Sequence, residues 1–381
     1  MKKVAHVCTT ALSYKILVDK LTLLKKYNYD IYLVSSEKGF NEELMANYEF
    51  KYKFVEMDRK INPLRDLISI LKLKKVFEEE GFDIVHTHTA KGGVIGRVAA
   101  TLAGVPLVLH TAHGLPFYEG QSKVIYFIYK TLEKIGSFFC HSVGSQNKED
   151  LRQLKSIVPK NVPVYYEGNG VDLEKLDETN KNISEKQLCR LKNILNIRDE
   201  QVVIFVGARF EPVKDHSLLI KSLKDLKEKY QKDFVCLLAG EGVLEKEINN
   251  EIVNSNLSNN VKIIGHQTDI YPYIKLADIV ALTSMKEGIP RIIMESMAFS
   301  KPVVATDVLG TRELVINNET GILVPYQNIE GLSDAFNLLI TNSHLRVDYG
   351  KQGRKRIEKE FTEEIVANRI HDFYSELQNS I

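Results

Sequence analysis

The amino-acid sequence predicts an α/β protein with two doubly wound parallel-sheet domains that face each other across a cleft. Short β-branched and apolar runs alternate with longer stretches of helical period along the chain, which is the pattern of parallel strands joined by crossover helices. The 381 residues, 44% of them hydrophobic and 27% charged, suffice for two cores of roughly 150–200 residues each. Ligands of such folds bind beyond the carboxyl ends of the strands, so we expect the site in the cleft.

Residues 1–171 form the first expected domain. One of its helices begins with Asn62 as N-cap and Pro63 in the first helical position, and it ends at Gly81; these residue types begin and end helices. Its apolar residues, at three- and four-residue spacing, are Leu64, Leu67, Ile68 and Leu71. The expected strands of this domain are Val4–Thr9, Asp30–Ser35, Lys53–Met57, Asp83–His88, Pro106–Thr111, Phe139–Gly144 and Pro163–Glu167.

Residues 172–361 form the second expected domain, which opens with a polar stretch. Because Asp172–Glu200 is rich in Lys, Glu and Asn and has no strand signal, we interpret it as the join between the domains. Helical periods close the chain over Ile329–Ile340, Leu345–Lys359 and Thr362–Leu377. The expected strands of this domain are Gln201–Gly207, Asp233–Gly240, Val261–Gly265, Asp278–Thr283, Pro302–Thr306 and Gly321–Pro325.

Charge and composition exclude several classes of function. The net charge of +1 gives no reason to expect a nucleic-acid partner, although residues 1–170 carry a net +6 and the remainder −5. The four cysteines are scattered, as is typical of reduced thiols in a cytoplasmic protein, and they predict no structural metal site. No apolar run reaches the roughly 18 residues that a membrane-spanning helix needs.

The loop Gly207–Lys214 leaves the first strand of the second domain at its carboxyl end. A flexible glycine followed by Arg209 and Lys214 puts two cations where an open α/β sheet binds ligands. Because arginine binds a diphosphate bidentately, the loop suits a nucleoside diphosphate. The alternative is an ordinary solvated surface loop.

The segment Ser284–Ala298 follows the strand expected at Asp278–Thr283. Pro290 lies near the start of a helix whose N-terminal N–H groups can bind phosphate. Glu287 lies in the loop before this helix, and Glu295 lies within its otherwise apolar sequence. Because an unpaired buried charge is costly, we expect Glu295 to bind ribose or sugar hydroxyls, or else to form a structural ion pair with a Lys or Arg.

Histidines follow two strands of the first domain. His113 precedes Gly114 in a loop after the strand Pro106–Thr111, where it can donate to a phosphate or hydroxyl; the alternative is a merely hydrogen-bonded loop histidine. His86 and His88 lie on one side of a strand, but no Asp, Glu or Cys nearby completes a ligand set, so we expect no metal.

Three familiar signatures are absent from the chain. No Asp-x-Asp pair occurs, which disfavours a diphosphate site built on a divalent cation. Thr9-Thr10-Ala11-Leu12-Ser13 follows the first strand in place of GxGxxG, and there is no Walker A motif and no GxSxG elbow. Nicotinamide dehydrogenases and serine hydrolases are therefore disfavoured.

Taken together, these motifs resemble glycosyltransferase family 4, the retaining transferases of GT-B fold with two Rossmann-like domains. The first domain looks like a bacterial branch that makes capsular polysaccharide, exopolysaccharide and lipid-linked glycans. The resemblance covers nearly the whole chain and rests on Gly207-x-Arg209-x4-Lys214, Glu287-x7-Glu295, Gly310-x-x-Glu313-x-Val315-x5-Gly321, His86-Thr87-His88-Thr89-x-Lys91, Thr111-Ala112-His113-Gly114 and Gly168-Asn169-Gly170.

The resemblance implies a role for each matching residue. Arg209 and Lys214 would bind the donor diphosphate, Glu287 the transferred sugar and Glu295 the ribose, while His113 would approach from the first domain. These residues, apart from Glu295, form the expected catalytic set. The expected donor site further includes Gly265 and His266 at the base, Gly288, Ile289, Pro290 and Arg291. The acceptor-side expectations are Thr10, Leu12 and Lys91. Thr10 and Leu12 lie in the loop after the first strand, where this chain departs from the Gly-Gly of many members.

The expected activity is that of a retaining hexosyltransferase. It would move a hexose or N-acetylhexosamine from a UDP-sugar to a polyprenyl-diphosphate-linked saccharide, with no cofactor and no metal. A helix at about 362–381 would cross back to the first domain. A nucleotide-sugar 2-epimerase of GT-B fold and a non-catalytic nucleotide-sugar-binding module remain as alternatives.

The stretch Gln121–Phe139 predicts a contact with the membrane. Lys123, Lys130 and Lys134 share one helical face, and apolar residues fill most other positions. Such a helix can rest on an anionic leaflet; the alternative is a core helix whose lysines reach solvent. With the resemblance, we expect a cytoplasmic protein that is peripheral at the inner face of the cell membrane.

Overall fold

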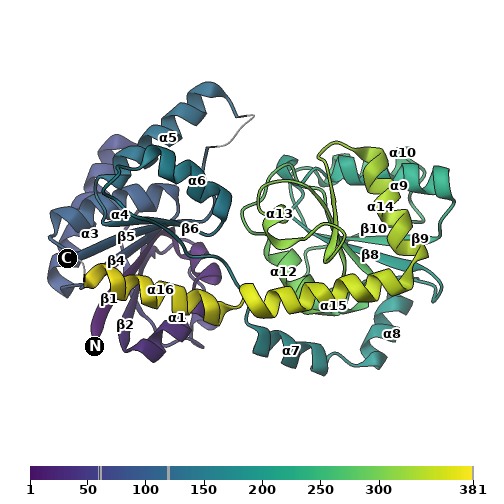
Figure 1. Cartoon of the computed structure of the whole chain (residues 1–381), viewed down its shortest axis with the longest axis horizontal. Coiled ribbons are helices and arrows are strands. Elements are labelled where there is room, and N and C mark those ends of the chain that lie inside the picture. Colours follow the sequence, from purple (N-terminus) through teal and green to yellow (C-terminus); the bar gives the residue numbers. More distant parts are fainter. Residues whose placement is uncertain (59, 61, 118–120, 380–381) are drawn as a thin grey trace. The chain divides into compact units, whose positions relative to one another are not determined.

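The chain forms two compact units in a computed structural model that describes residues 1–58, 60, 62–117 and 121–379. Unit 1 comprises Met1–Asn169 together with Glu363–Ile381, and unit 2 comprises Gly170–Thr362 (Figure 1). A parallel sheet of seven strands underlies unit 1, and one of six strands underlies unit 2. The predicted fold class is therefore confirmed. Residues 380–381 of the expected last helix lie outside the described residues.

The sheet of unit 1 has the order β3-β2-β1-β4-β5-β6-β7. Each of its strands overlaps an expected one; the edge strand differs most, because it begins at Lys51 and the expected strand began at Lys53. The strands are β1 (Lys2–Thr10), β2 (Tyr29–Ser36), β3 (Lys51–Phe54), β4 (Ile84–His88), β5 (Leu107–Ala112), β6 (Ser142–Ser145) and β7 (Val164–Tyr166).

Helices cover both faces of this sheet, because successive residues of a strand point to opposite faces. Val4 packs in one apolar cluster with α1 (Val18–Leu24) and α16 (Glu363–Gln378), whereas Ala5 packs in another with α3 (Pro63–Glu80) and α4 (Ala90–Leu102). The last helix of the chain thus completes one face of unit 1. The other helical elements of this unit are η1 (Ala11–Ile16), η2 (Lys25–Tyr27), α2 (Glu42–Met45), α5 (Lys123–Ser137) and α6 (Lys148–Ile157).

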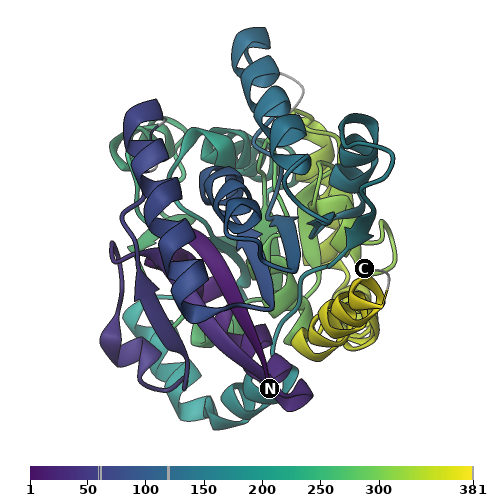
Figure 2. The same cartoon turned by 90° about the vertical axis from the view of Figure 1, so that its left-hand side faces the viewer.

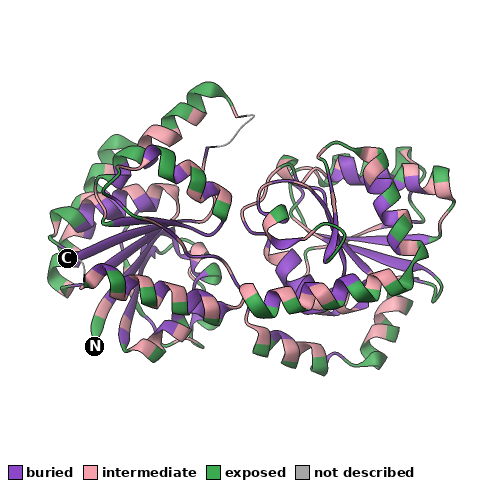
Figure 3. Ribbon diagram, in the orientation of Figure 1, coloured by how far each residue is buried: buried purple, intermediate pink, exposed green. Residues whose placement is uncertain are grey.

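Helix α3 has the ends that the sequence predicts but not the expected burial. The Asn62 side chain accepts from the backbone N–H of Arg65, and Gly81 ends the helix with φ +63°. Leu73 and Phe77 are buried. The apolar residues that identified the helix face solvent instead, with 53–78% of their surface exposed; they are Leu64, Leu67, Ile68 and Leu71 (Figure 3).

Unit 2 has the sheet order β10-β9-β8-β11-β12-β13, and all of its strands overlap expected ones. The strands are β8 (Val202–Gly207), β9 (Phe234–Ala239), β10 (Val261–Gly265), β11 (Ile279–Leu282), β12 (Val303–Thr306) and β13 (Gly321–Val324). The helices are α7 (Leu173–Asn182), α8 (Glu185–Ile194), η3 (Pro212–Lys214), α9 (His216–Tyr230), α10 (Glu245–Asn254), α11 (Tyr271–Leu276), α12 (Arg291–Ala298), α13 (Thr311–Leu314), α14 (Ile329–Thr341) and α15 (Ser343–Glu360).

The polar stretch 172–200 is part of unit 2, so its interpretation as the join between the domains was wrong. It forms α7 and α8, whose few apolar residues reach a core: Leu176 and Ile183 are buried in one cluster with strands β8 and β11. Arg354 on α15 also donates to both carboxylate oxygens of Asp177 on α7. Few apolar residues suffice to pack these helices, because each contacts the core of unit 2 through only one narrow apolar stripe.

Candidate functional site

The loops after β8 and β11 meet at the carboxyl edge of the sheet in unit 2. The backbone N–H of Met285 donates to the carbonyl of Val213 at 2.9 Å. This contact brings two predicted residues together: the Lys214 Nζ lies 2.6 Å from the Glu287 Oε1, and both side chains are less than a fifth exposed. Ser284, which the sequence analysis did not select, also donates its hydroxyl to Glu287. Its position directly after a strand at this edge was the available signal.

The backbone of the loop after β12 holds Glu287 in place. The backbone N–H of Glu287 donates to the carbonyl of Leu309 in that loop at 3.2 Å. Gly310 has φ +87°, and a Cβ there would lie 1.8 Å from the carbonyl oxygen of Gly288, so this close approach requires glycine. Buried Ile289 and then Pro290, the N-cap of α12, follow directly. The carboxylate therefore projects from a rigid backbone beside the start of a helix.

Glu295 forms the ion pair that was the alternative interpretation. It is 5% exposed, and its Oε1 lies 3.0 Å from the Nε of Arg291, one turn earlier on α12. The Tyr271 hydroxyl, at 3.4 Å, also donates to it. The i,i+4 spacing of Arg291 and Glu295 was visible in the sequence. A role of Glu295 toward ribose stays a prediction.

The remaining donor-side residues lie at the same edge of the sheet. The Arg209 side chain is 70% exposed and pairs with Glu211. Gly265 ends β10 with φ +69°, and its carbonyl accepts from Gly240 at the end of β9. His266 is exposed. Because β8, β9 and β10 are neighbours, these residues share one surface of unit 2.

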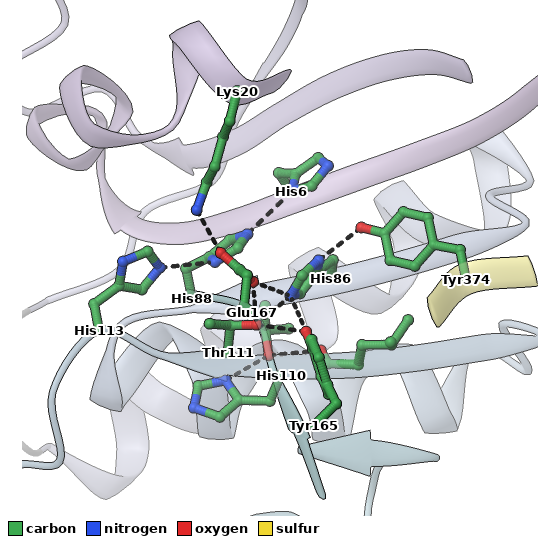
Figure 4. Close-up of polar contacts among 12 residues, drawn as sticks. His6, Lys20, His86, His88, His110, Thr111, His113, Tyr165, Glu167 and Tyr374 are labelled. Atoms are coloured by element: carbon green, nitrogen blue, oxygen red, sulfur yellow. Dashed lines mark hydrogen bonds and ion pairs between the residues drawn. The ribbon is translucent and has the colours of Figure 1, made fainter. Parts of the chain in front are cut away.

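Imidazoles from β1, β4 and the loop after β5 form a polar network in unit 1 (Figure 4), in which His6 and His88 are buried and His113 is half-buried. His6 Nδ1 lies 3.0 Å from His88 Nε2, and His88 Nδ1 lies 3.0 Å from His113 Nε2. The sequence analysis missed His6, although it stands opposite His86 in the register of β1 and β4. The pairing of β1 with β4 places His6 beside these rings, and the sequence alone does not show which strands pair.

A buried ion pair forms the other half of the network. Lys20 on α1 pairs with Glu167 at the end of β7, and both side chains are fully buried. Thr111 donates to the second oxygen of Glu167 at 2.6 Å. His86 joins Thr111 to the Tyr374 hydroxyl of α16, at 2.8 and 2.6 Å. Burial alone would raise the pKa of Glu167, but the Lys20 ammonium and the hydroxyl donor hold that pKa below its ordinary value.

The three-ring chain is neutral at pH 7. Burial, with the charge of Lys20 as a further cause, lowers the pKa of His113 to about 4, and burial lowers the pKa of His6 and His88 as well. A neutral imidazole has one donor and one acceptor nitrogen. The two ends of the chain, His6 Nε2 and His113 Nδ1, have no hydrogen-bond partner among the described residues. A group that bound His113 Nδ1 would therefore set the tautomer of all three rings.

A partly different set of rings, His6, His86 and His88, comes nearest to a metal site within the described residues. Ligand nitrogens of His6, His86 and His88 lie within 4.8 Å of one another. A cation there would displace the His6–His88 hydrogen bond and would lie near the buried Lys20 ammonium, whose charge lowers the pKa of these histidines. The absence of a metal requirement stays a prediction.

The acceptor-side residues border the carboxyl end of β1. Thr10 is buried, and Lys91, at the start of α4, pairs with Asp66 on α3 at 2.6 Å. Thr10 and Lys91 line one cavity of unit 1. Leu12 is 43% exposed and does not line that cavity. The structure thus brings two of the three together.

Both units of the chain match families of known proteins. Residues 6–143 match the family glycosyl transferase 4-like, and residues 190–356 match glycosyl transferases group 1. The UDP-Gal:α-D-GlcNAc-diphosphoundecaprenol α-1,3-galactosyltransferase of Escherichia coli is 28% identical over 98% of this chain and 97% of that protein. An uncharacterized glycosyltransferase of Methanocaldococcus jannaschii is 30% identical over 84% of this chain and 83% of that protein.

A solved structure has the same fold over its full length. Anabaena HepE, in complex with UDP and glucose, matches with a TM-score of 0.81 at 20% identity, covering 99% of this chain and 100% of that one. The sequence motifs of unit 2, from Arg209 to Glu295, fall within the group 1 match. With both sheets, both family matches and these relatives in agreement, the chain belongs to the glycosyl transferases, as a GT-B enzyme with a 4-like first domain and a group 1 second domain.

Proposed function

We propose that this glycosyltransferase moves a hexose or N-acetylhexosamine, with retention, from a UDP-sugar to a polyprenyl-diphosphate-linked saccharide during surface polysaccharide or glycan synthesis. The observation that carries the proposal is the pair of Lys214 and Glu287 at the carboxyl edge of the sheet in unit 2. A cation for a diphosphate and a carboxylate for sugar hydroxyls lie side by side there. The E. coli relative, named for a UDP-sugar donor and a lipid-linked acceptor, supports the choice of substrates.

Binding of the donor would exchange partners within this pair. Without ligand, the Lys214 ammonium is held by the Glu287 carboxylate, and Arg209 is held by Glu211. A diphosphate offers both cations stronger charge-assisted hydrogen bonds. Glu287 would then accept hydrogen bonds from the sugar. Residues 1–171 would carry the acceptor and residues 172–361 the donor.

The reaction follows from where charge develops. As the bond between sugar and phosphate breaks, negative charge grows on the diphosphate, and Arg209, Lys214 and the N–H groups at the start of α12 stabilise it. Because Glu287 and Glu295 are committed to the donor, the acceptor hydroxyl would attack from the same face, with the departing phosphate taking its proton. Neutral His113 would donate its Nδ1 hydrogen to the sugar or its phosphate.

Helix α5 supports placement of the enzyme on a membrane. Its buried residues are Glu133, Gly136 and Ser137, and Glu133 pairs with buried Arg97. Tyr126, Tyr129 and Leu132 are half-buried. Four other apolar residues form the opposite, exposed face, with exposures of 43–70%; they are Val124, Phe127, Ile128 and Ile135. This exposed apolar face favours an interfacial helix over the core helix considered above. Among the described residues, no helix is long and apolar enough to cross a membrane.

The first prediction concerns the two cations. The donor is first identified by thermal shift, since a ligand at about 100 times its Kd stabilises the fold by about 2.7 kcal/mol. Lys214→Ala or Arg209→Ala should then lower kcat by about 10²–10³-fold, because these charges act most strongly on the transition state. Lys221→Ala, an exposed lysine on α9, is the control and should be neutral. Normal kcat at saturating donor would remove either cation from the mechanism.

The second prediction separates the two carboxylates. Glu287→Gln should impair transfer while leaving the affinity for UDP almost unchanged, because UDP has no sugar at that position. Glu295→Gln should weaken the binding of UDP itself, because the ribose hydroxyls lose the carboxylate that accepts their hydrogen bonds. Titration calorimetry with UDP measures both affinities. Equal effects of the two substitutions would show that the assigned roles are wrong.

The third prediction is independence from divalent metal. Because Arg209 and Lys214 neutralise the diphosphate, transfer should keep its rate in excess EDTA. The rate is measured before and after chelation, and again after addition of magnesium or manganese. Loss of activity that either ion restores would contradict the proposed stabilisation of the leaving group.

The fourth prediction concerns the lysines beside the apolar face of α5. The protein should sediment with vesicles containing anionic lipid at low salt and be released at high salt, because salt screens these charges. Changing Lys123, Lys130 and Lys134 to Glu should weaken sedimentation. The control changes three exposed lysines of unit 2 to Glu and should leave sedimentation unchanged; these lysines are Lys221, Lys224 and Lys246. Insensitivity to both salt and the α5 variant would exclude this helix as the contact.

A further inference from the structure

A mostly apolar cavity in unit 1, which the acceptor-side residues Thr10 and Lys91 line, has no part of a substrate assigned to it so far. It has a volume of about 390 Å³ and lies between α3, α4 and α5, beside the carboxyl end of β1. Each helix contributes apolar side chains to its wall: Ile70 from α3, Val94 and Ile95 from α4, and Tyr129 and Leu132 from α5. Thr9, Thr10 and Thr89 lie on its polar side, toward the strands. Each helix also contributes one charged residue, and these charges are held in ion pairs, Asp66 with Lys91 and Glu133 with Arg97. The wall is therefore mostly apolar, with its charges paired and with threonines at one end.

A second cavity continues from the polar end. It has a volume of about 690 Å³ and shares Thr10 with the first cavity. Its lining carries three cationic side chains, from Lys38, Lys60 and Arg65, against one carboxylate, that of Asp58. An apolar cavity thus adjoins a cationic one, and Thr10 lies at the boundary.

The helices that enclose the apolar cavity also present apolar residues to the outside. Helix α4 packs against both α3 and α5, and the three helices follow one another across unit 1 (Figure 2). On α3, Leu64 and Leu67 are 78% and 54% exposed; on α5, Val124 and Phe127 are 70% and 69% exposed. Exposed apolar residues this close together mark a contact with protein or membrane. An apolar chain could enter the cavity from such a contact without crossing water.

We propose that the apolar cavity binds the isoprene units nearest the diphosphate of a prenyl-diphosphate substrate, with the diphosphate over the cationic cavity. This inference rests on the proposed function, because it assigns a place to the lipid of that acceptor. One apolar chain joined directly to a polyanion matches one apolar cavity joined directly to a cationic one. A phospholipid fits less well, because it has two acyl chains and the cavity would leave one of them outside.

Farnesyl diphosphate, a water-soluble compound of this class, tests the proposal on the full chain. It should bind at least about tenfold more tightly than inorganic diphosphate, because only its chain fills the cavity. Val94→Phe and Leu132→Trp add volume at two half-exposed cavity residues and should each remove this preference. Leu67→Gln alters the outer face of α3, away from the cavity, and should leave the preference unchanged.

Binding of UDP to each variant separates this proposal from the function it rests on. Unchanged UDP affinity with loss of the farnesyl preference supports the cavity assignment, and it also shows that the variants fold. Equal affinity for farnesyl diphosphate and inorganic diphosphate in the unaltered chain would overturn the assignment while leaving the UDP site intact. Displacement of farnesyl diphosphate by an equal concentration of dihexanoylphosphatidylglycerol would assign the cavity to phospholipid instead. Failure of the unaltered chain to bind any nucleoside diphosphate would count against the proposed function, not against the cavity.

Discussion

The buried ion pair of Lys20 and Glu167 is the constraint on which unit 1 depends. Desolvation of two charges is repaid only when every remaining polar atom finds a partner, and Glu167 finds Thr111, which in turn bonds His86. His86 requires the Tyr374 hydroxyl from α16. The polar interior therefore extends from α1 across the sheet to a helix that lies more than 200 residues later in the chain, and it specifies where that helix docks.

The ion pair of unit 2 has the opposite character, and this difference supports its proposed role. Lys20 and Glu167 are fully buried, whereas Lys214 and Glu287 retain 18% and 9% exposure. Because both side chains of this pair reach solvent, water or a ligand can take the place of either partner, and neither charge is left buried without a partner. A ligand of higher charge can therefore displace one partner at small cost. The backbone contact of Gly288 with Gly310 keeps the carboxylate in place during that exchange.

The sequence predicted every strand of both sheets and most of the donor-side residues, because those signals are local. Short runs of β-branched and apolar residues mark strands that are buried on both faces, and a polar residue directly after a strand marks the carboxyl edge. His6 was missed because its partner His88 lies far away in sequence. Ser284 was missed although its partner Glu287 is three residues away and its position after a strand was a local signal. Helix α3 shows a different limit: the spacing of Leu64 and Leu67 indicates an apolar face, but spacing cannot say whether protein, lipid or water covers it.

A prenyl chain on the acceptor would explain why the apolar face of α3 is exposed. Each methylene group moved from an apolar medium into water costs about 0.8 kcal/mol, so lifting even one isoprene unit clear of a bilayer is expensive. An enzyme that acts on the diphosphate end must therefore reach into the bilayer surface or enclose part of the chain itself. The exposed stripes of α3 and α5 suit the first task, and the cavity between these helices suits the second. The buried Arg97–Glu133 pair anchors the inner face of α5, beside the cavity residues Tyr129 and Leu132, while Val124 and Phe127 face outward.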